Sequence, residues 1–128
     1  MVTGITEGVK ISVETVFQDE FSNPMNEVFL FAYKIEIQNL TDQYIQLKRR
    51  NWTIFDSNGS VREVEGSGVV GEQPIIAPGN AHSYVSACNL TTDMGSMKGY
   101  YSMTRFPDES VFQVEIPQFE LIAPHRLN

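Results

Sequence analysis

The chain has 128 residues, of which 41% are hydrophobic, and this is enough apolar material for the core of one domain but not of two. Its 16 acidic residues outnumber its nine basic residues and give a formal net charge of −7. Because phosphate backbones and anionic membrane surfaces are bound by clustered Lys and Arg, the composition argues against nucleic acid and membranes as partners.

Nothing in the N-terminal segment indicates export. Residues 1–11 alternate polar and apolar side chains and lack the basic and apolar regions of a secretion signal. No apolar run approaches the roughly 18–20 residues that span a bilayer. The one cysteine, Cys88, excludes an intrachain disulfide and suits a reducing compartment. We therefore expect a soluble, cytoplasmic protein.

Alternation of apolar and polar residues with a period of two dominates the first third of the chain. Apolar side chains occupy odd positions over Val9–Phe17 and again over Phe29–Ile37. Successive side chains of a strand point to opposite faces, so both stretches are predicted strands with one buried face. The second stretch is the stronger, since five large apolar residues share its buried face.

The third predicted strand, Ile45–Phe55, changes phase. Its apolar residues are odd-numbered at first, with Leu47, and even-numbered later, with Trp52. One extra residue restores a common face, so we predict a β-bulge near Arg49–Asn51. The Asn-Gly pair that follows is a strong hairpin-turn signal and predicts a short return strand over Val61–Glu65.

The second half of the chain predicts three more strands. A turn at Ala77–Asn80 leads into a strand over His82–Leu90, and a loop over Thr91–Gly95 precedes a strand over Met97–Phe106. The last strand contains Pro117, which cannot donate to a ladder and therefore marks a bulge or an edge position.

No stretch has the pattern of a helix. About seven to eight strands with regular turn signals indicate an all-β fold, an immunoglobulin or fibronectin type III-like sandwich of two antiparallel sheets. We expect a single domain over residues 1–128 that ends in a loose tail over Ala123–Asn128.

One motif, G-x-G-x-x-G, occurs at Gly66, Ser67, Gly68, Val69, Val70 and Gly71. In dinucleotide-binding folds this pattern joins a strand to a helix whose free N–H groups face a pyrophosphate. Here Pro74 and Pro78 follow, and a helix cannot run through two prolines so placed. The dinucleotide fold is therefore excluded.

Two interpretations of the motif remain. In the structural one, the favoured of the two, the glycines let the chain bend sharply, with positive φ or close packing. In the functional one, successive backbone N–H groups form an anion-binding nest for a phosphate-bearing ligand. Arg49 and Arg50 lie nearby in the run from Lys48 and would assist such a ligand.

The chain lacks a recognisable catalytic set. Its two histidines are His82, at a strand start, and His125, in the predicted tail. Cys88 lies in phase with apolar residues of its strand and has no basic neighbour in sequence that would lower its pKa. One cysteine and two separated histidines also make a structural metal site improbable. We expect neither an enzyme nor a cofactor.

A protein-binding surface is the stronger expectation. The edges of a sandwich are open and can accept a strand from a partner. Alternation sends Met97, Tyr101 and Met103 to one face of their strand and Tyr100 to the other. Met94 and Tyr100 are therefore the candidate contact residues.

Five stretches taken together resemble the ApaG family: Trp52–Asp56, Glu65–Pro74, Ala77–Gly79, Gly95–Tyr101 and Phe112–Phe119. The resemblance implies a fibronectin type III-like fold and a family without an established enzymatic activity. It implies an association with cobalt and magnesium resistance and with a neighbouring diadenosine-tetraphosphate hydrolase. Related domains in F-box proteins and a polymerase-interacting protein look like protein-binding modules, and the glycine motif is a proposed pyrophosphate site.

We therefore expect a non-enzymatic interaction domain that is a monomer or a weak homo-oligomer. Its partner would be a protein, held at a sheet edge or by the loops at one end. The alternative is a small-ligand module that binds a nucleotide or polyphosphate at Gly66–Gly71.

Overall fold

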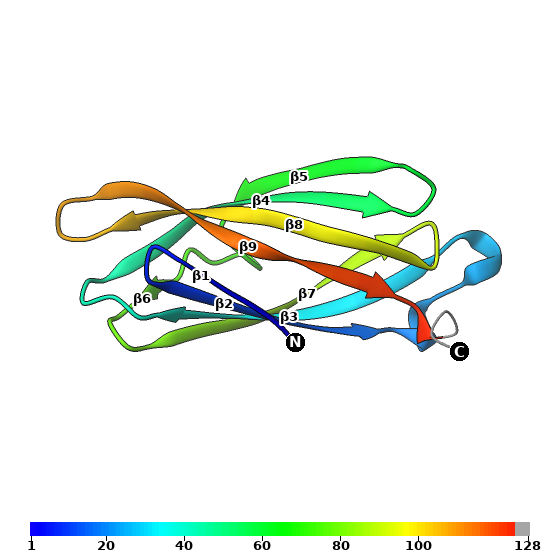
Figure 1. The fold of residues 1–128 in the computed structure, drawn as a ribbon, viewed down its shortest axis with the longest axis horizontal. Helices are drawn as coiled ribbons and strands as arrows, with labels where there is room; N and C mark the ends of the chain where they lie inside the picture. The colour runs from blue at the N-terminus through cyan, green and yellow to red at the C-terminus, as the bar shows by residue number, and fades with distance from the viewer. Residues whose placement is uncertain (125–128) are drawn as a thin grey trace.

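The structure is a computed structural model and describes residues 1–124. Two antiparallel sheets pack face to face, and their strands run roughly along the long axis of the molecule (Figure 1). The described residues contain no α-helix; two short 3-10 turns, η1 (Asp19–Phe21) and η2 (Pro24–Asn26), lie between β2 (Val9–Phe17) and β3 (Phe29–Asn39). The predicted all-β sandwich is confirmed.

The first sheet has the strand order β1-β2-β3-β7. Its strands are β1 (Val2–Thr6), β2 (Val9–Phe17), β3 (Phe29–Asn39) and β7 (Ala81–Leu90). The alternation did not separate β1 from β2. Between them lies a tight turn at Glu7 and Gly8, whose φ values are 53° and 76°, and such a pair is typical of a two-residue hairpin.

The second sheet has the order β5-β4-β8-β9, with β6 paired to β4. Its strands are β4 (Ile45–Asp56), β5 (Val61–Ser67), β6 (Ile75–Ile76), β8 (Met94–Arg105) and β9 (Ser110–Ile122). β8 begins three residues earlier than predicted, which shortens the expected loop. The stretch from Val69 to Ile76 is a crossover with one tight turn and only two residues of strand.

One core lies between the sheets, and the predicted inward faces supply it. The odd-numbered apolar residues of β2 and β3 are buried as far as Val13 and Ile37. The centre is aromatic: the ring centroids of Tyr33 and Trp52 lie 5.6 Å apart, and each ring lies 5.9 Å from that of Phe119. Edge-to-face aromatic pairs of this kind favour one packing over alternatives.

The bulge in β4 lies one residue before its predicted position. The pairing with β8 shifts between Leu47 and Arg49, so the extra residue is Lys48. The bulge restores a common inward face for Leu47 and Trp52, and it also turns Arg50 to that face. Arg50 is half-buried, whereas Arg49 is exposed on the opposite face.

Pro117 marks a second bulge, as predicted. Met97 of β8 pairs with Phe119 and Gly99 pairs with Ile116, so Pro117 and its successor oppose one residue of β8. β9 runs beside β1 across the two sheets, and a Cβ added to Gly4 would lie 3.4 Å from Pro117. This contact closes one side of the sandwich.

The predicted loose tail does not include Ala123. This residue is fully buried, and its N–H donates to the carbonyl of Asp93 at 2.9 Å. Burial of its small side chain under the end of the sandwich explains the difference. Pro124 is exposed, and residues 125–128 of the predicted tail, including His125, lie outside the described residues.

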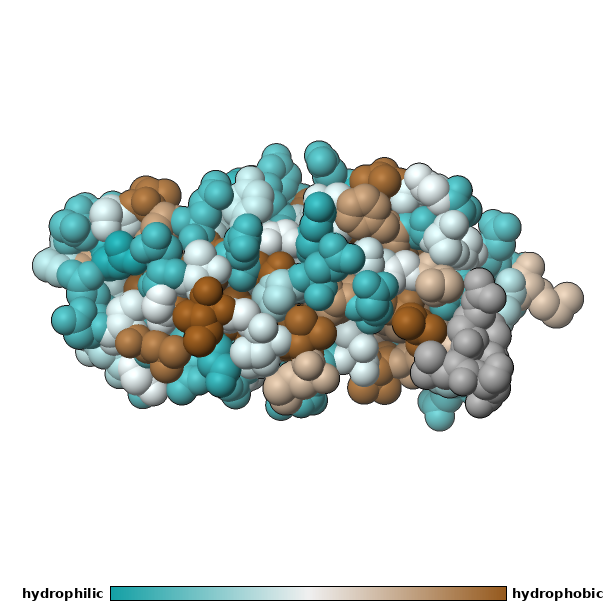
Figure 2. Space-filling view, in the orientation of Figure 1, coloured by the Kyte–Doolittle hydropathy of each residue, from teal (hydrophilic) through white to brown (hydrophobic). Residues whose placement is uncertain are grey.

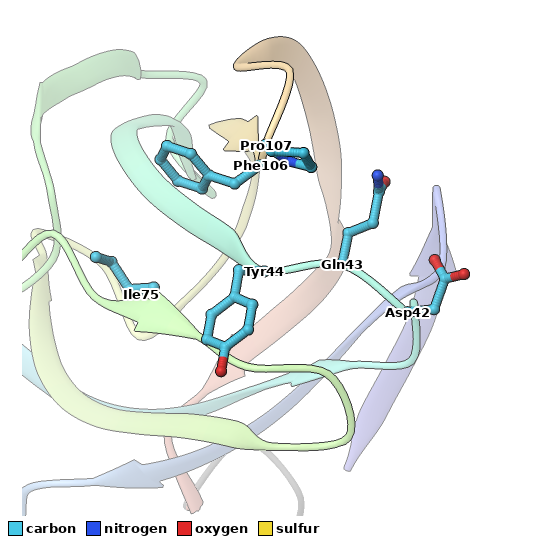
Figure 3. A pocket seen from close by; sticks show the side chains of 6 residues that line it. All are labelled: Asp42, Gln43, Tyr44, Ile75, Phe106 and Pro107. Carbon is cyan, nitrogen blue, oxygen red and sulfur yellow. The ribbon is translucent and has the colours of Figure 1, made fainter.

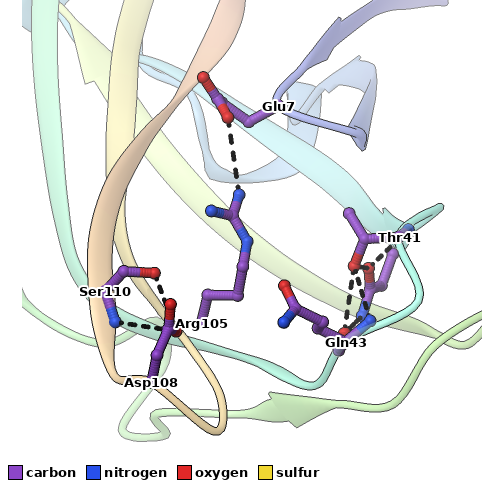
Figure 4. Close-up of polar contacts among 7 residues, drawn as sticks. Glu7, Thr41, Gln43, Arg105, Asp108 and Ser110 are labelled. Carbon is purple, nitrogen blue, oxygen red and sulfur yellow. Dashed lines mark hydrogen bonds and ion pairs between the residues drawn. The ribbon is translucent and has the colours of Figure 1, made fainter.

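A buried asparagine organises one end of the sandwich. The side-chain amide of Asn39 donates to the carbonyls of Gln43, at 2.8 Å, and Ile76, at 3.0 Å. Its Oδ1 accepts from the N–H and the hydroxyl of Thr41. The hydroxyl of Thr41 also donates to the carbonyl of Gln43 in the same turn (Figure 4). Asn39 is fully buried with each of its polar atoms satisfied, so it fastens β3, the β3–β4 turn and β6 to one another.

A carboxylate organises the other end. Asp56, the last residue of β4, accepts hydrogen bonds from the N–H and the hydroxyl of both Thr91 and Thr92. Partial burial opposes ionisation, but the bonds from Thr92 and Thr91 outweigh it and hold the pKa of Asp56 below its ordinary value. The β4–β5 hairpin is thereby tied to the β7–β8 loop.

Candidate functional site

The glycine motif forms a bend between β5 and β6. Gly68, Val70 and Gly71 have positive φ values of 64°, 46° and 77°. Val69 and Glu72 pair across the bend, with the N–H of each donating to the carbonyl of the other. A Cβ at Gly68 would lie 2.1 Å from the carbonyl oxygen of Glu72, so only glycine fits there. These contacts support the structural interpretation.

The amides of the motif do not form a continuous nest. Gly66 and Ser67 belong to β5 and pair with β4. The N–H of Gly68 donates to the carbonyl of Lys48, and that of Val69 to the carbonyl of Glu72, each at 2.8 Å. An anion-binding nest requires successive free N–H groups that converge on one point. The bend therefore offers a polyphosphate few donors.

The carbonyls of the bend face a cation instead. Nη1 of Arg50 donates to the carbonyls of Ser67, at 3.0 Å, and Gly68, at 2.8 Å. The same guanidinium lies against Gly66, where an added Cβ would be 2.9 Å from Nη2. The structure thus brings Arg50 to the motif, while Arg49 lies on the far face of β4.

Beside this bend, the sandwich is open between β5 and β7. A cleft of about 350 Å³ enters there. Its walls include the aromatic rings of Tyr33 and Trp52, the apolar Val64 and Cys88, and the guanidinium groups of Arg50 and Arg62. The cleft combines an apolar floor with a cation near each end.

Neither arginine of this cleft has an acidic partner in the described part of the chain. Arg62 donates to the carbonyl of Asn89 and lies 3.5 Å from Sγ of Cys88. Within residues 1–124, the ion pairs are His82 with Glu72, at 3.9 Å, and Arg105 with Glu7, at 3.6 Å. In this part of the chain neither cleft arginine has a carboxylate partner.

Cys88 is not activated for nucleophilic chemistry. Burial raises the pKa of its thiol, and the contact with Arg62 offsets that effect only in part. The buried hydroxyls of Tyr84 and Tyr101 are hydrogen-bonded to each other, and burial raises both of their pKa values. These three groups therefore stay neutral at physiological pH.

β7 forms the rim of the cleft and is an edge strand. The N–H of Asn39 donates to the carbonyl of Asn80 at 2.9 Å. Because antiparallel bonds alternate along a strand, even-numbered residues of β7 direct their backbone groups toward β3 and odd-numbered residues direct theirs outward. Glu72 and Arg62 cover the two ends of this edge. Among the described strands β7 pairs with β3 alone, so the outward N–H groups of Ser83, Val85 and Ala87 have no partner strand.

Known proteins share this architecture and sequence. The family profile described as "ApaG domain" matches residues 19–105. Protein ApaG of Methylorubrum extorquens strain PA1 is 45% identical over 120 residues, which are 94% of this chain and 92% of that protein. Protein ApaG of Brucella canis is 40% identical over 126 residues, covering 98% and 96%. The chain belongs to the ApaG family.

A solved structure agrees with this membership. The putative ApaA protein from Bordetella pertussis superposes on this ApaG chain with a TM-score of 0.87 at 37% identity. The match covers 91% of this chain and 94% of that one. At this identity the likeness extends beyond the fold to the family, and the two-sheet sandwich is common to both.

The two candidate contact residues do not form one surface of the ApaG domain. Met94 is the first residue of β8 and Tyr100 lies six residues along the strand, which separates them by about 20 Å. Tyr100 is half-buried on the outer face of the second sheet, beside Asn51 and Glu115. Met97, Tyr101 and Met103, which alternation places together on one face of the strand, are all buried.

A second hollow lies at the end of the sandwich that Asn39 organises. It has a volume of about 450 Å³ and is lined by Tyr44, Ile75, Phe106, Pro107 and the Asp42–Gln43 turn (Figure 3). Tyr44 and Ile75 are 54% and 61% exposed. Its one ionisable acid, Asp42, has no basic counterpart in the lining, so it lacks a pair for acid–base catalysis.

Other kinds of site find little support in the part of the chain that the structure describes. No group of three or more His, Cys, Asp and Glu side chains there could hold a metal ion. No helix over residues 1–124 is long and apolar enough to cross a membrane. Figure 2 shows hydrophobic residues on one face as small patches separated by polar ones, not as a broad apolar interface.

Arg50 was a candidate site residue from the sequence, but the cleft to which it belongs was not predicted. Arg50 and Arg62 are twelve residues apart and come together because the β4–β5 hairpin pairs Arg50 with Gly66 and Ile54 with Arg62. The available signal was the phase change in β4, since a bulge before residue 50 turns that residue inward.

Proposed function

We propose that this ApaG domain is a non-enzymatic protein-binding domain that adds an extended segment of a partner protein to the outer edge of β7. In this mode the backbone groups of an exposed edge pair with a peptide, and nearby side chains select its sequence. The observation that carries the proposal is the unprotected state of β7.

Natural sandwiches protect their edges with charges, prolines or covering segments. Here β1 and β9 lie beside each other, and β9 carries Pro117. β5 carries Arg62, Glu63 and Glu65, all exposed. β7, in contrast, has ten residues with the sequence AHSYVSACNL, without a proline, acid, lysine or arginine. Among the four outer strands of the described sheets, β7 alone lacks the charges, prolines or covering strand that would prevent pairing with a further strand.

The free part of this edge is short. Outward backbone groups are available at Ser83, Val85 and Ala87, which are enough for a segment of about five residues. Each new hydrogen bond contributes only about 0.5–1.5 kcal/mol net, so backbone pairing alone gives weak binding. A useful affinity requires contacts from the partner's side chains.

A proline at Val85 tests the edge directly. Val85 is 58% exposed and its N–H points outward, and proline is tolerated on an edge strand at such a position. We expect Val85→Pro to leave the fold intact and to abolish binding of the neutral peptide Ac-TQTVTQT-NH2, measured by shifts of the β7 amide resonances in NMR. The matched control, Val85→Thr, keeps the N–H and should bind as the parent does.

Two results would contradict the proposal. One is equal binding of the peptide by Val85→Pro and the parent. The other is protection of the β7 amides that grows with protein concentration in the absence of peptide, which would make the edge an interface between copies of this chain.

We propose that any part the domain has in cobalt or magnesium resistance is exerted through its partner, because a metal cluster is not found in the described residues.

A further inference from the structure

We infer that the cleft behind β7 selects a partner segment with the pattern acidic-x-apolar-x-acidic, whose acidic side chains meet Arg50 and Arg62. This inference rests on the proposed pairing at the β7 edge. A strand added there would direct every second side chain between the sheets, into the cleft. The cleft therefore determines which residues the segment carries at those positions.

The two guanidinium groups provide the first step. A guanidinium has five N–H donors, and those of Arg50 and Arg62 meet only carbonyl oxygens and one sulfur among the described residues. Carbonyl partners leave the full positive charge uncompensated. Sixteen acidic residues are present in the chain, yet none of those described lies within ion-pair distance of either arginine. A carboxylate from outside is the group that completes such a pair.

The surface between the arginines provides the second step. Val64 lies on the inner face of β5, opposite Trp52, and is 40% exposed because the mouth above it is open. Trp52 and Cys88 form the floor beneath and are themselves almost fully buried. An apolar side chain placed here would cover Val64 and remove apolar surface from water.

The separation of the two arginines matches the spacing of side chains on an added strand. Arg50 pairs with Gly66 and Arg62 with Ile54, so the arginines are set by positions of β4 four residues apart, which is about 13 Å along a strand. Three successive inward side chains of an added strand span the same distance. The outer two reach the arginines and the middle one reaches Val64, which gives the inferred pattern.

The negative net charge of the chain does not prevent an acidic segment from binding at the cleft. Glu63 and Glu65 pair with Thr53 and Asn51, and alternation places them on the outer face of the sheet, away from the cleft. At physiological salt the Debye length is about 8 Å, so acids elsewhere on the surface are screened. The arginines therefore determine the potential within the cleft.

Three peptides test the selection: Ac-TETVTET-NH2, its glutamine counterpart Ac-TQTVTQT-NH2 and its lysine counterpart Ac-TKTVTKT-NH2. We expect the acidic peptide to bind about fivefold or more tightly than the neutral one, and the basic peptide to bind most weakly. The preference should disappear at 1 M NaCl. Arg62→Gln should reduce it to about twofold without changing the affinity for the neutral peptide.

The control variant is Arg49→Gln, which removes the same charge from the exposed face of β4 and should leave the preference intact. Arg62 is exposed on an edge strand, so its replacement leaves the core untouched; Arg50→Gln provides the second test if it folds. Equal affinities for the acidic and neutral peptides, with shifts at Ser83 and Val85, would overturn the selection and leave the edge proposal standing. An acidic preference unchanged by Arg62→Gln would also overturn it. Absence of β7 shifts with all three peptides would reject both proposals.

Discussion

Replacement of Asn39 by alanine should destabilise the domain more than any other single polar substitution at its loop ends. The substitution removes four hydrogen bonds. It leaves the N–H of Thr41 without its acceptor and takes one donor from each of the carbonyls of Gln43 and Ile76, although the hydroxyl of Thr41 still donates to Gln43 at 3.1 Å. A buried polar group left unpaired costs about 1–3 kcal/mol. Gln43 and Thr41 are half-buried, so water would recover part of this loss, and we expect a decrease of about 3–4 kcal/mol in the free energy of unfolding.

Urea unfolding followed by the fluorescence of Trp52 measures this change. Asn39→Asp provides a further test, because it keeps the acceptor for Thr41 and replaces the donating amide by an oxygen that faces two carbonyls. We expect it to be at least as destabilising as alanine at pH 7. Asn58→Ala is the control, since Asn58 also bonds to backbone and side chain but is exposed. A loss below about 1 kcal/mol for Asn39→Ala would refute the assigned role of this network.

Three further outcomes are expected. Asp56→Asn should lower the free energy of unfolding by about 1–2 kcal/mol at pH 7. Because the folded pKa of Asp56 lies below its ordinary value, this difference should shrink as the pH falls below about 4, and urea unfolding at a series of pH values measures it. Gly68→Ala should lower the free energy of unfolding by about 2–4 kcal/mol, because its Cβ would meet the Glu72 carbonyl. Gly71→Ala is the control: its φ is similar but nothing lies within 4 Å of the added Cβ, so it should cost only about 1–2 kcal/mol in the same assay. An NMR titration with ATP or a diadenosine polyphosphate, with and without magnesium, should give no saturable shifts at Gly66–Gly71; saturable shifts there would restore the nucleotide-binding alternative.

The architecture was predictable because a strand with one buried face alternates apolar and polar residues along the sequence. The five apolar residues of β3 and the Asn-Gly turn after β4 each depend on neighbours along the chain, and both were recognised correctly. The same reasoning explains why the bulge was placed one residue late. A phase change between Leu47 and Trp52 shows that one residue is extra but not which one, and the pairing with β8 decides it.

The candidate site was predictable only in fragments, since it depends on which strands are neighbours. The absence of charge in β7 is visible in the sequence, but that β7 is an edge follows from the order β1-β2-β3-β7. Arg62 could not be recognised as a site residue from the sequence, because its partner, the carbonyl of Asn89, lies on a strand of the other sheet. The glycine motif drew attention as a potential ligand site, while its carbonyls are occupied by Arg50.

The bulge at Lys48 makes the chemistry of the cleft sensitive to residue number as well as to residue type. Deletion of Lys48 would leave four steps between Leu47 and Trp52, so a regular strand would still direct both of them and Arg50 inward. Deletion of Arg50 would also keep Leu47 and Trp52 in phase, but it would bring Arg49 to the inward position. The burial of Leu47 and Trp52 therefore determines which residue between them faces the cleft. A substitution in this strand changes the side chain that faces the cleft, whereas a change of length at Arg50 changes which residue of the strand faces it.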